Sequence, residues 1–228
     1  NRNAYLGVLL DEDTMSTLGT LAEALAARPA LLLGAAEGED IGFREVEQDA
    51  RHMTFMFFGE YLRQLPADEL RAVHAALLRE LQRAVELGAS EAPLAFSSIE
   101  FFPPEKANLI VAFFEPTPQL LKLRERMVSS IKEVAVSLPR AFLDQLESEG
   151  SWKPHVTLGK IGASKAQLGR LSCRQEALQA LAPQSPALAL GLTLLGERPL
   201  RAWCDWDEAL TFEAFKHEEE EREDAEGA

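Results

Sequence analysis

Residues 51–59 read Arg-His-Met-Thr-Phe-Met-Phe-Phe-Gly, and residues 154–160 read Pro-His-Val-Thr-Leu-Gly-Lys. Both are short runs rich in apolar residues with a glycine near their end, which is typical of buried β-strands. Each run contains a histidine and a threonine two positions apart. Because side chains at i and i+2 of a strand point to the same face, each strand is predicted to present one imidazole and one hydroxyl together.

The residues that alternate with these pairs are large and apolar, and they point to the opposite face of each strand. That opposite face is therefore the predicted core face. Two such strands facing one another would surround a single cleft with four polar side chains. These candidate site residues are His52, Thr54, His155 and Thr157.

This set of groups suits the cleavage of a phosphodiester without a metal ion. Of two imidazoles near neutral pH, a neutral one can act as general base and a protonated one as general acid. Two hydroxyls can donate to the non-bridging phosphate oxygens and hold the phosphorus in line. The pattern therefore favours a phosphodiesterase.

The rest of the chain alternates helical and extended patterns, with hairpin-like pairs that favour antiparallel pairing and an α+β fold. Segments 35–49 and 140–150 are predicted to be polar surface loops. A helix capped by Asp13 or Thr14 is expected to be interrupted at Pro29. The other predicted helices span 66–88, 118–138 and 164–181. The other predicted strands span 5–10, 94–102, 109–114, 187–195 and 200–212 in whole or part.

Residues 52–60 and 154–160 resemble the two motifs of the 2H phosphoesterase superfamily, including the proline before His155 and the leucine after Thr157. The form they resemble is that of the LigT-like RNA 2′,3′-cyclic phosphodiesterases, once called 2′-5′ RNA ligases. The resemblance implies a bilobal fold, with two antiparallel sheets and outer helices around a central cleft. It implies that the cleft holds the four His and Thr residues as catalytic groups, and by analogy that His155 is the base and His52 the acid.

Within this superfamily, the match at residues 58–60 favours hydrolysis of RNA 2′,3′-cyclic phosphate ends to a 2′-phosphate. Relatives that cleave 2′-5′-linked oligoadenylate or trim the 3′ ends of RNA supply the alternative reactions. A non-catalytic module that binds nucleotides or RNA ends is a further alternative, as is a scaffold that recruits a partner. The expected partners are thus RNA ends or small cyclic-phosphate nucleotides.

Four residues beside the motifs are secondary candidates for substrate binding. Tyr61 and Trp152 are candidates for stacking on a base, although both also suit packing in the core. Lys153 and Lys160 are candidates for adding positive charge near the phosphate.

Composition and charge narrow the class of protein. The chain of 228 residues has a net charge of −14 and a pI of about 4.8, which argues against an extended grip on nucleic acid. No apolar run approaches the roughly 20 residues that span a bilayer. With four histidines and two distant cysteines, no metal site and no cofactor are expected.

The sequence predicts one bilobal domain over 1–215, followed by an acidic and disordered tail over 216–228. We expect a soluble, cytoplasmic monomer. Because the numbering does not begin with Met, the earlier removal of a targeting segment stays open.

Overall fold

The computed structural model describes residues 4–86, 93–148, 152–195 and 210–211. Its centre is an antiparallel sheet of eight strands in the order β4-β5-β6-β3-β1-β7-β8, with β2 paired to β6 beside this path. The strands are β1 (Ala4–Leu10), β2 (Arg44–Glu45), β3 (Met53–Gly59), β4 (Phe96–Phe102), β5 (Leu109–Phe114), β6 (His155–Lys160), β7 (Ala189–Leu195) and β8 (Leu210–Thr211).

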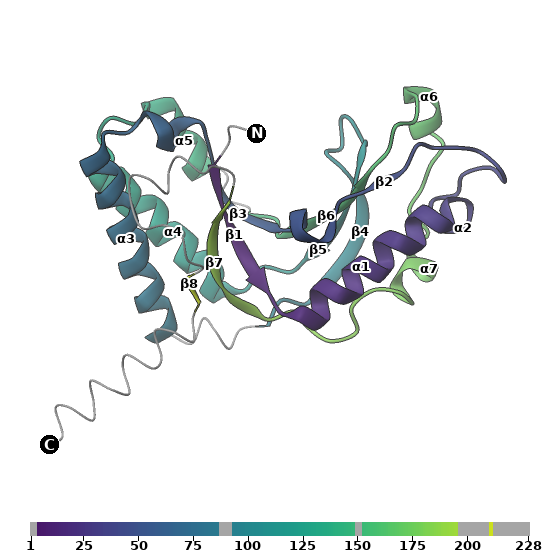
Figure 1. Cartoon of the computed structure of the whole chain (residues 1–228), viewed down its shortest axis with the longest axis horizontal. Helices are drawn as coiled ribbons and strands as arrows, with labels where there is room; N and C mark the ends of the chain where they lie inside the picture. Colours follow the sequence, from purple (N-terminus) through teal and green to yellow (C-terminus); the bar gives the residue numbers. More distant parts are fainter. Residues whose placement is uncertain (1–3, 87–92, 149–151, 196–209, 212–228) are drawn as a thin grey trace, which may run out of the picture.

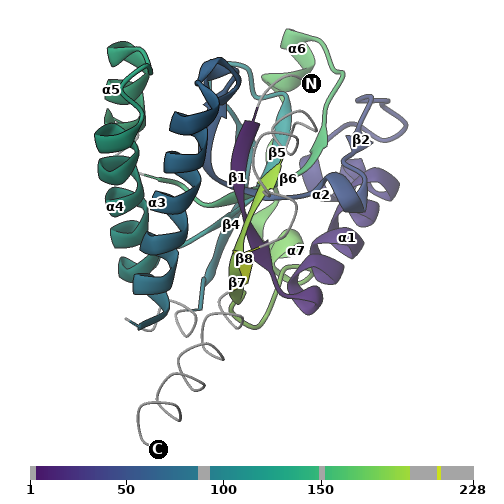
Figure 2. The ribbon, with the colours of Figure 1, turned by 60° about the vertical axis from the view of Figure 1, so that its left-hand side comes forward.

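Helices lie outside the two arms of this sheet. Figure 1 shows α3, α4 and α5 outside the arm with β1, β7 and β8, and α1, α2 and α7 outside the arm with β4, β5 and β6. In Figure 2 the strands lie between these two groups of helices. The helices are α1 (Glu12–Ala27), α2 (Pro29–Leu33), α3 (Ala67–Glu86), α4 (Pro118–Val134), α5 (Arg140–Ser148), α6 (Lys165–Leu168) and α7 (Gln175–Gln179), with short 3-10 turns η1 (Gln48–Ala50) and η2 (Tyr61–Gln64).

The α+β antiparallel architecture expected from the sequence is confirmed, with one difference in detail. The two expected sheets are joined into one, because β3 and β6 pair through Met53 and Val156. Each motif strand thus forms the inner edge of its own arm, and the two motifs meet where the arms join.

The long helices form because one face of each can bury a stripe of leucines and related residues against the sheet. In α3 the fully buried stripe is Leu70, Val73, Leu77 and Leu81, and in α4 it is Leu120, Leu123, Met127 and Ile131. Thr117 caps α4 by accepting a hydrogen bond from the Leu120 amide at 3.2 Å, and Pro118 occupies the first turn. At α1 the cap is Asp11, which accepts from the Thr14 amide at 2.9 Å; the cap expected at Asp13 or Thr14 was placed too late.

Two glycines explain how the motif strands end and pack. Gly59 has φ of +56°, a left-handed conformation that lets the chain leave β3 sharply. At Gly159 a Cβ atom would collide with the Phe43 ring and lie 2.8 Å from the Arg44 carbonyl oxygen. A side chain there would therefore push β2 away from β6.

Three loop and helix predictions are wrong in detail. Residues 140–150 contain α5, because Phe142, Leu143 and Leu146 form a short stripe that is buried among charged neighbours. The single helix expected over 164–181 is divided into α6 and α7, since the amides of Ser172 and Arg174 bond instead to carbonyls at the end of α2. Segment 35–49 carries β2 and the start of η1.

Most of the strand expected within 200–212 and all of the tail 216–228 lie outside the described residues; Leu210–Thr211 is β8. Over the portions that are described, no helix combines the length and apolar character needed to cross a bilayer.

Candidate active site

The register of the central strands gathers the four predicted site residues. Met53 lies opposite Val156 in an antiparallel pair. Extending this register by one residue in each direction places His52 opposite Thr157, and Thr54 opposite His155. Residues opposite one another in an antiparallel pair point to the same face and have Cβ atoms about 5 Å apart. His52, Thr54, His155 and Thr157 thus form one cluster, which we call the His–Thr quartet.

The quartet lies on the face of the sheet that turns away from the helices. Met53 and Val156 are fully buried in the core on the helix side, whereas all four members of the quartet are partly exposed. Alternation from His52 to Phe55 and from His155 to Leu158 therefore separates core from site, as the sequence predicts. We refer to this side of the sheet as the site face. The prediction that Phe57 also faces the core is wrong: an irregularity in the pairing of β3 with β1 reverses the alternation, so Phe57 is 40% exposed and Met56 and Phe58 are buried.

Both imidazoles are anchored in the same way. The Nδ1 atom of His52 lies 2.8 Å from the carbonyl oxygen of Ala50, and the Nδ1 atom of His155 lies 2.8 Å from that of Lys153. A carbonyl oxygen can only accept, so Nδ1 carries the proton in each ring. The Nε2 atom of each ring is left to take or give a proton.

Aromatic rings flank the two imidazoles on either side. The ring of Tyr5 in β1 lies 4.7 Å from that of His52, between centroids. On the other arm, Phe102 and Phe113 lie 4.9 and 5.5 Å from the His155 ring. None of these three residues is recognisable from the sequence, because only strand pairing brings them beside the motifs. These rings restrict the imidazoles and shield them from water.

The surroundings of His155 favour its neutral form. Burial lowers the pKa of His155 from its ordinary value, and the charge of nearby His52 lowers it further, whereas the bond to the Lys153 carbonyl acts in the opposite direction. His155 is therefore the ring held neutral, with Nε2 available as a proton acceptor.

The hydroxyl groups of the quartet are available for a ligand. Among the described residues, neither Thr54 nor Thr157 uses its hydroxyl to bond a protein partner. Their positions opposite His155 and His52 place one hydroxyl beside each imidazole. The cluster offers two proton-transfer groups and two donors on one face.

The family model of the 2′-5′ RNA ligase superfamily matches residues 23–195, about three quarters of the chain. The chain belongs to this superfamily. The resemblance inferred from the two motifs is thereby confirmed, and membership supports a phosphoesterase as the general class of enzyme. No curated protein is significantly similar to the chain in sequence.

Solved structures are similar to this 2′-5′ RNA ligase superfamily member over most of its length. TT0787 of Thermus thermophilus is 22% identical, with 86% of this chain and 88% of that chain covered and a TM-score of 0.50. E. coli LigT complexed with 3′-AMP is 14% identical, with 84% of each chain covered and a TM-score of 0.37. Kluyveromyces marxianus Usb1 with uridine monophosphate is 13% identical, with 85% and 91% covered and a TM-score of 0.40.

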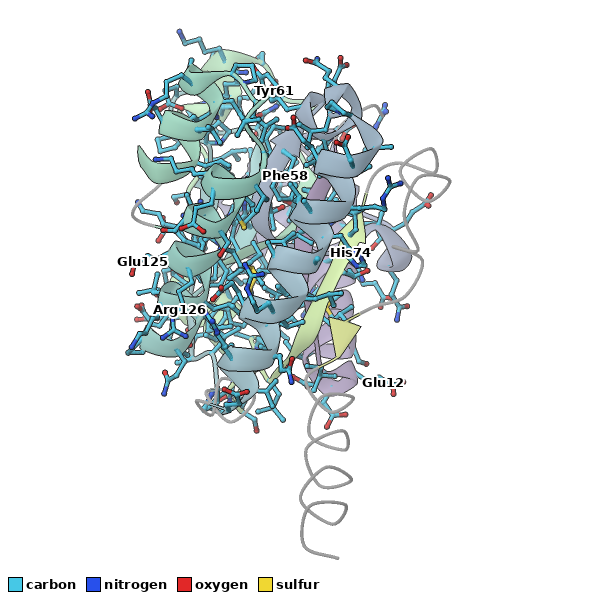
Figure 3. The ribbon with its side chains drawn as sticks, turned by 90° about the vertical axis from the view of Figure 1, so that its left-hand side faces the viewer. Glu12, Phe58, Tyr61, His74, Glu125 and Arg126 are labelled. Carbon is cyan, nitrogen blue, oxygen red and sulfur yellow. The ribbon has the colours of Figure 1, made fainter. Side chains whose placement is uncertain are left out.

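The structure places the secondary candidates of this superfamily member in different surroundings. Tyr61 stacks on Phe142 of α5 at 4.3 Å between ring centroids, at the top of the helix layer (Figure 3). Trp152 is only 8% exposed and packs edge-on against Phe55, on the helix side of β3. Lys153 and Lys160 are both exposed, at the two ends of the second motif. His74 lies on α3, outside the quartet (Figure 3).

Trp152 connects the two motifs. Its indole N–H donates to the carbonyl oxygen of Thr54 at 2.9 Å. The next residue, Lys153, supplies the carbonyl oxygen that anchors His155. On the same strand as Thr54, the carbonyl of Phe55 accepts from the buried Arg124 at 3.2 Å. Trp152 therefore links one motif to the other, a role different from base stacking.

We expect Trp152→Phe to lower both stability and turnover. Phenylalanine retains an aromatic contact with Phe55 but leaves the partly buried Thr54 carbonyl without this donor, which costs about 1–3 kcal/mol. Urea denaturation measures the first effect and kcat the second. Phe142→Leu on α5 is the matched control, because it loses packing without touching either motif. A variant with unchanged kcat would show that the hydrogen bond from Trp152 to the Thr54 carbonyl does not position the quartet.

Metal-binding geometry is not found in the described part of the superfamily member. No group of three or more His, Cys, Asp or Glu side chains gathers there in a way that could hold a metal ion. The quartet itself offers two imidazoles and two hydroxyls, and it lacks the carboxylate or thiolate that commonly completes a catalytic zinc site.

Proposed function

We propose that this protein is a metal-independent phosphodiesterase that hydrolyses RNA 2′,3′-cyclic phosphate ends to a 2′-phosphate. The observation that carries the proposal is the matched anchoring of His52 and His155. Two imidazoles with the same tautomer, each beside a threonine hydroxyl on one face, are the groups that acid–base cleavage of a phosphodiester needs.

His155 acts as the general base and His52 as the general acid. The Nε2 atom of His155 removes a proton from water as the water oxygen bonds to phosphorus. The bond from phosphorus to the ribose 3′-oxygen breaks, and Nε2 of His52 gives its proton to that oxygen. The assignment follows from the lowered pKa of His155, since burial disfavours a charge on this ring. The product is a 2′-phosphate with a free 3′-hydroxyl.

The hydroxyls of Thr54 and Thr157 donate to the two non-bridging phosphate oxygens. These donors are preorganised by the rigid strands β3 and β6, so they stabilise the charge that develops on phosphorus without further reorganisation. The negative net charge of the chain makes such local donors more important for binding a phosphate anion.

The proposed base predicts the acidic limb of the pH profile. Protonation of His155 abolishes its function, so kcat/KM should fall as the pH drops through the pKa of this ring. Because that pKa is lowered, we expect the midpoint of the acidic limb below about 6.5, the ordinary value for histidine. Initial rates across the acidic and neutral pH range, at constant ionic strength, measure the midpoint. A midpoint clearly above that ordinary value would contradict the assignment of His155 as base.

The proposed reaction is tested by turnover of the four 2′,3′-cyclic nucleotides and of a short RNA ending in a 2′,3′-cyclic phosphate. The assay contains excess EDTA, and chromatography against standards distinguishes the 2′-phosphate from the 3′-phosphate. Conversion to a 2′-phosphate supports the proposal. Loss of turnover with EDTA would oppose the metal-independent mechanism. A 3′-phosphate product would mean that the ribose 2′-oxygen, and not the 3′-oxygen, is the leaving group. If cyclic phosphates are inert, cleavage of 2′-5′-linked or 3′-5′-linked oligonucleotides would identify another reaction.

A further inference from the structure

We propose that the arm formed by β4 and β5 carries the subsite for the nucleoside attached to the scissile phosphate, and that Glu100 there favours bases with an exocyclic amino group. This inference rests on the proposed function and deepens it. Its first support is the register across three strands. Ser98 lies opposite Phe113, and Phe113 lies opposite His155.

A second row of paired residues runs parallel to the first. Glu100 lies opposite Val111, and Val111 lies opposite Thr157. Because paired residues share a face, both rows continue the site face from the quartet onto β5 and β4. Neighbouring strands are about 4.8 Å apart, so Ser98 and Glu100 lie on the order of 10 Å from the quartet. A nucleoside bound through its phosphate at the quartet can span that distance.

A cavity lies beside this surface. It has a volume of about 490 Å³, and its lining includes Ser98, Glu100, Phe113, Glu115 and Lys153. That volume falls within the range of small-molecule sites. It borders the quartet directly, because Phe113 packs on the His155 ring at 5.5 Å and the Lys153 carbonyl anchors the same ring at 2.8 Å.

The chemistry of the lining determines which end of a nucleotide fits. Ionised carboxylates only accept hydrogen bonds, so Glu100 and Glu115 disfavour phosphate oxygens and favour N–H donors. Ser98 donates to Glu100 Oε1 at 2.7 Å and orients this carboxylate. The partly exposed ring of Phe113 gives a base an apolar surface. The phosphate therefore binds at the quartet, and the base binds here with its amino group toward Glu100.

A cavity of about 640 Å³ between α3 and α4 has no comparable character. Its lining balances Arg83, Lys122 and Arg126 against Glu80, Glu86 and Glu125, and it lies on the helix side (Figure 3). This mixture is typical of a solvated surface, so the nucleoside is assigned to the cavity beside His155.

The test compares 2′,3′-cyclic CMP with 2′,3′-cyclic UMP, which differ mainly in an N4 amino group and an O4 carbonyl at the same position. We expect wild-type kcat/KM to be about tenfold higher for the cytidine substrate. A ratio of this size is what one additional hydrogen bond to a charged group produces. In Glu100→Ala this ratio should approach one, and in Ser98→Ala it should lie between. Using the ratio cancels the effect that removing a negative charge has on both anionic substrates.

Glu23→Ala is the matched control, because it removes the same charge from the exposed side of α1 and should keep the wild-type ratio. A wild-type ratio near one, or a ratio that Glu100→Ala leaves intact, would overturn the subsite while turnover still supported the proposed function. If no cyclic nucleotide is hydrolysed, the proposed function fails. The subsite is then judged by calorimetric Kd values for 2′-CMP and 2′-UMP in wild type and Glu100→Ala, with the same ratio as criterion.

Discussion

His155→Ala and His52→Ala are each expected to lower kcat for 2′,3′-cyclic nucleotides by a hundredfold or more. Each removes one proton-transfer group, and such groups contribute about 10²–10⁴-fold. The double variant should be little worse than either single variant, since the two imidazoles act as a unit in one step. Steady-state kinetics over the pH range measures all three variants. His155→Ala should also lose the acidic limb of the profile.

His74→Ala provides the control for these substitutions. This histidine lies on α3, outside the quartet, so the variant should retain the wild-type pH profile and most of the turnover. Near-normal turnover in both motif variants would place the catalytic groups outside the quartet, and absence of turnover in the wild type would favour the alternative of a nucleotide-binding module. A large loss in only one of them would leave a single acid–base group and reject the two-histidine mechanism.

Thr54→Val and Thr157→Val are expected to have the next largest effect, a loss of about a hundredfold in kcat. Valine keeps the branched shape that suits a strand, but it removes the hydroxyl that donates to the phosphate. Loss of one preorganised donor to a developing charge costs about 10²–10³-fold. Because the charge develops in the transition state, kcat should fall more than KM rises.

Threonine to serine at the same two positions separates chemistry from packing. Serine keeps the hydroxyl and loses only a methyl group, so Thr54→Ser and Thr157→Ser should retain most of the turnover that the valine variants lose. Circular dichroism and thermal unfolding establish that all four variants are folded. Equal losses in the serine and valine variants would indicate that the methyl group, and not the hydroxyl, is what the site needs.

Much of the site could be predicted because strand geometry is local. From His52 to Phe55 and from His155 to Leu158, the alternation of His and Thr with large apolar residues separates site face from core face without any knowledge of the fold. It failed at Phe57, which is exposed because an irregularity in the pairing of β3 with β1 reverses the alternation. The same reasoning failed for α5, where three apolar residues in a charged segment give too short a stripe to be distinguished from a loop. It also failed for residues 164–181, where bonds to the end of α2 override the local preference for helix.

The roles of the flanking residues could not be predicted, because they depend on pairing between distant segments. Trp152 was a candidate for stacking on a base from its position in the sequence, yet its bond to the Thr54 carbonyl joins residues 98 positions apart. Tyr5, Phe102 and Phe113 reach the imidazoles only because β1, β4 and β5 lie in the same sheet. Sequence separation hides such contacts until strand order is known.

The order of residues alone was enough to establish the two motif strands, the face on which each His–Thr pair lies and the superfamily to which they point. Those features depend on periodicity within a few residues, which the backbone geometry of a strand imposes. The folded chain was needed to establish that the two motifs pair through Met53 and Val156, that burial lowers the pKa of His155, and which surface continues from the quartet. Register and burial arise between segments that are distant in the chain, and for that reason the local pattern carries no information about them.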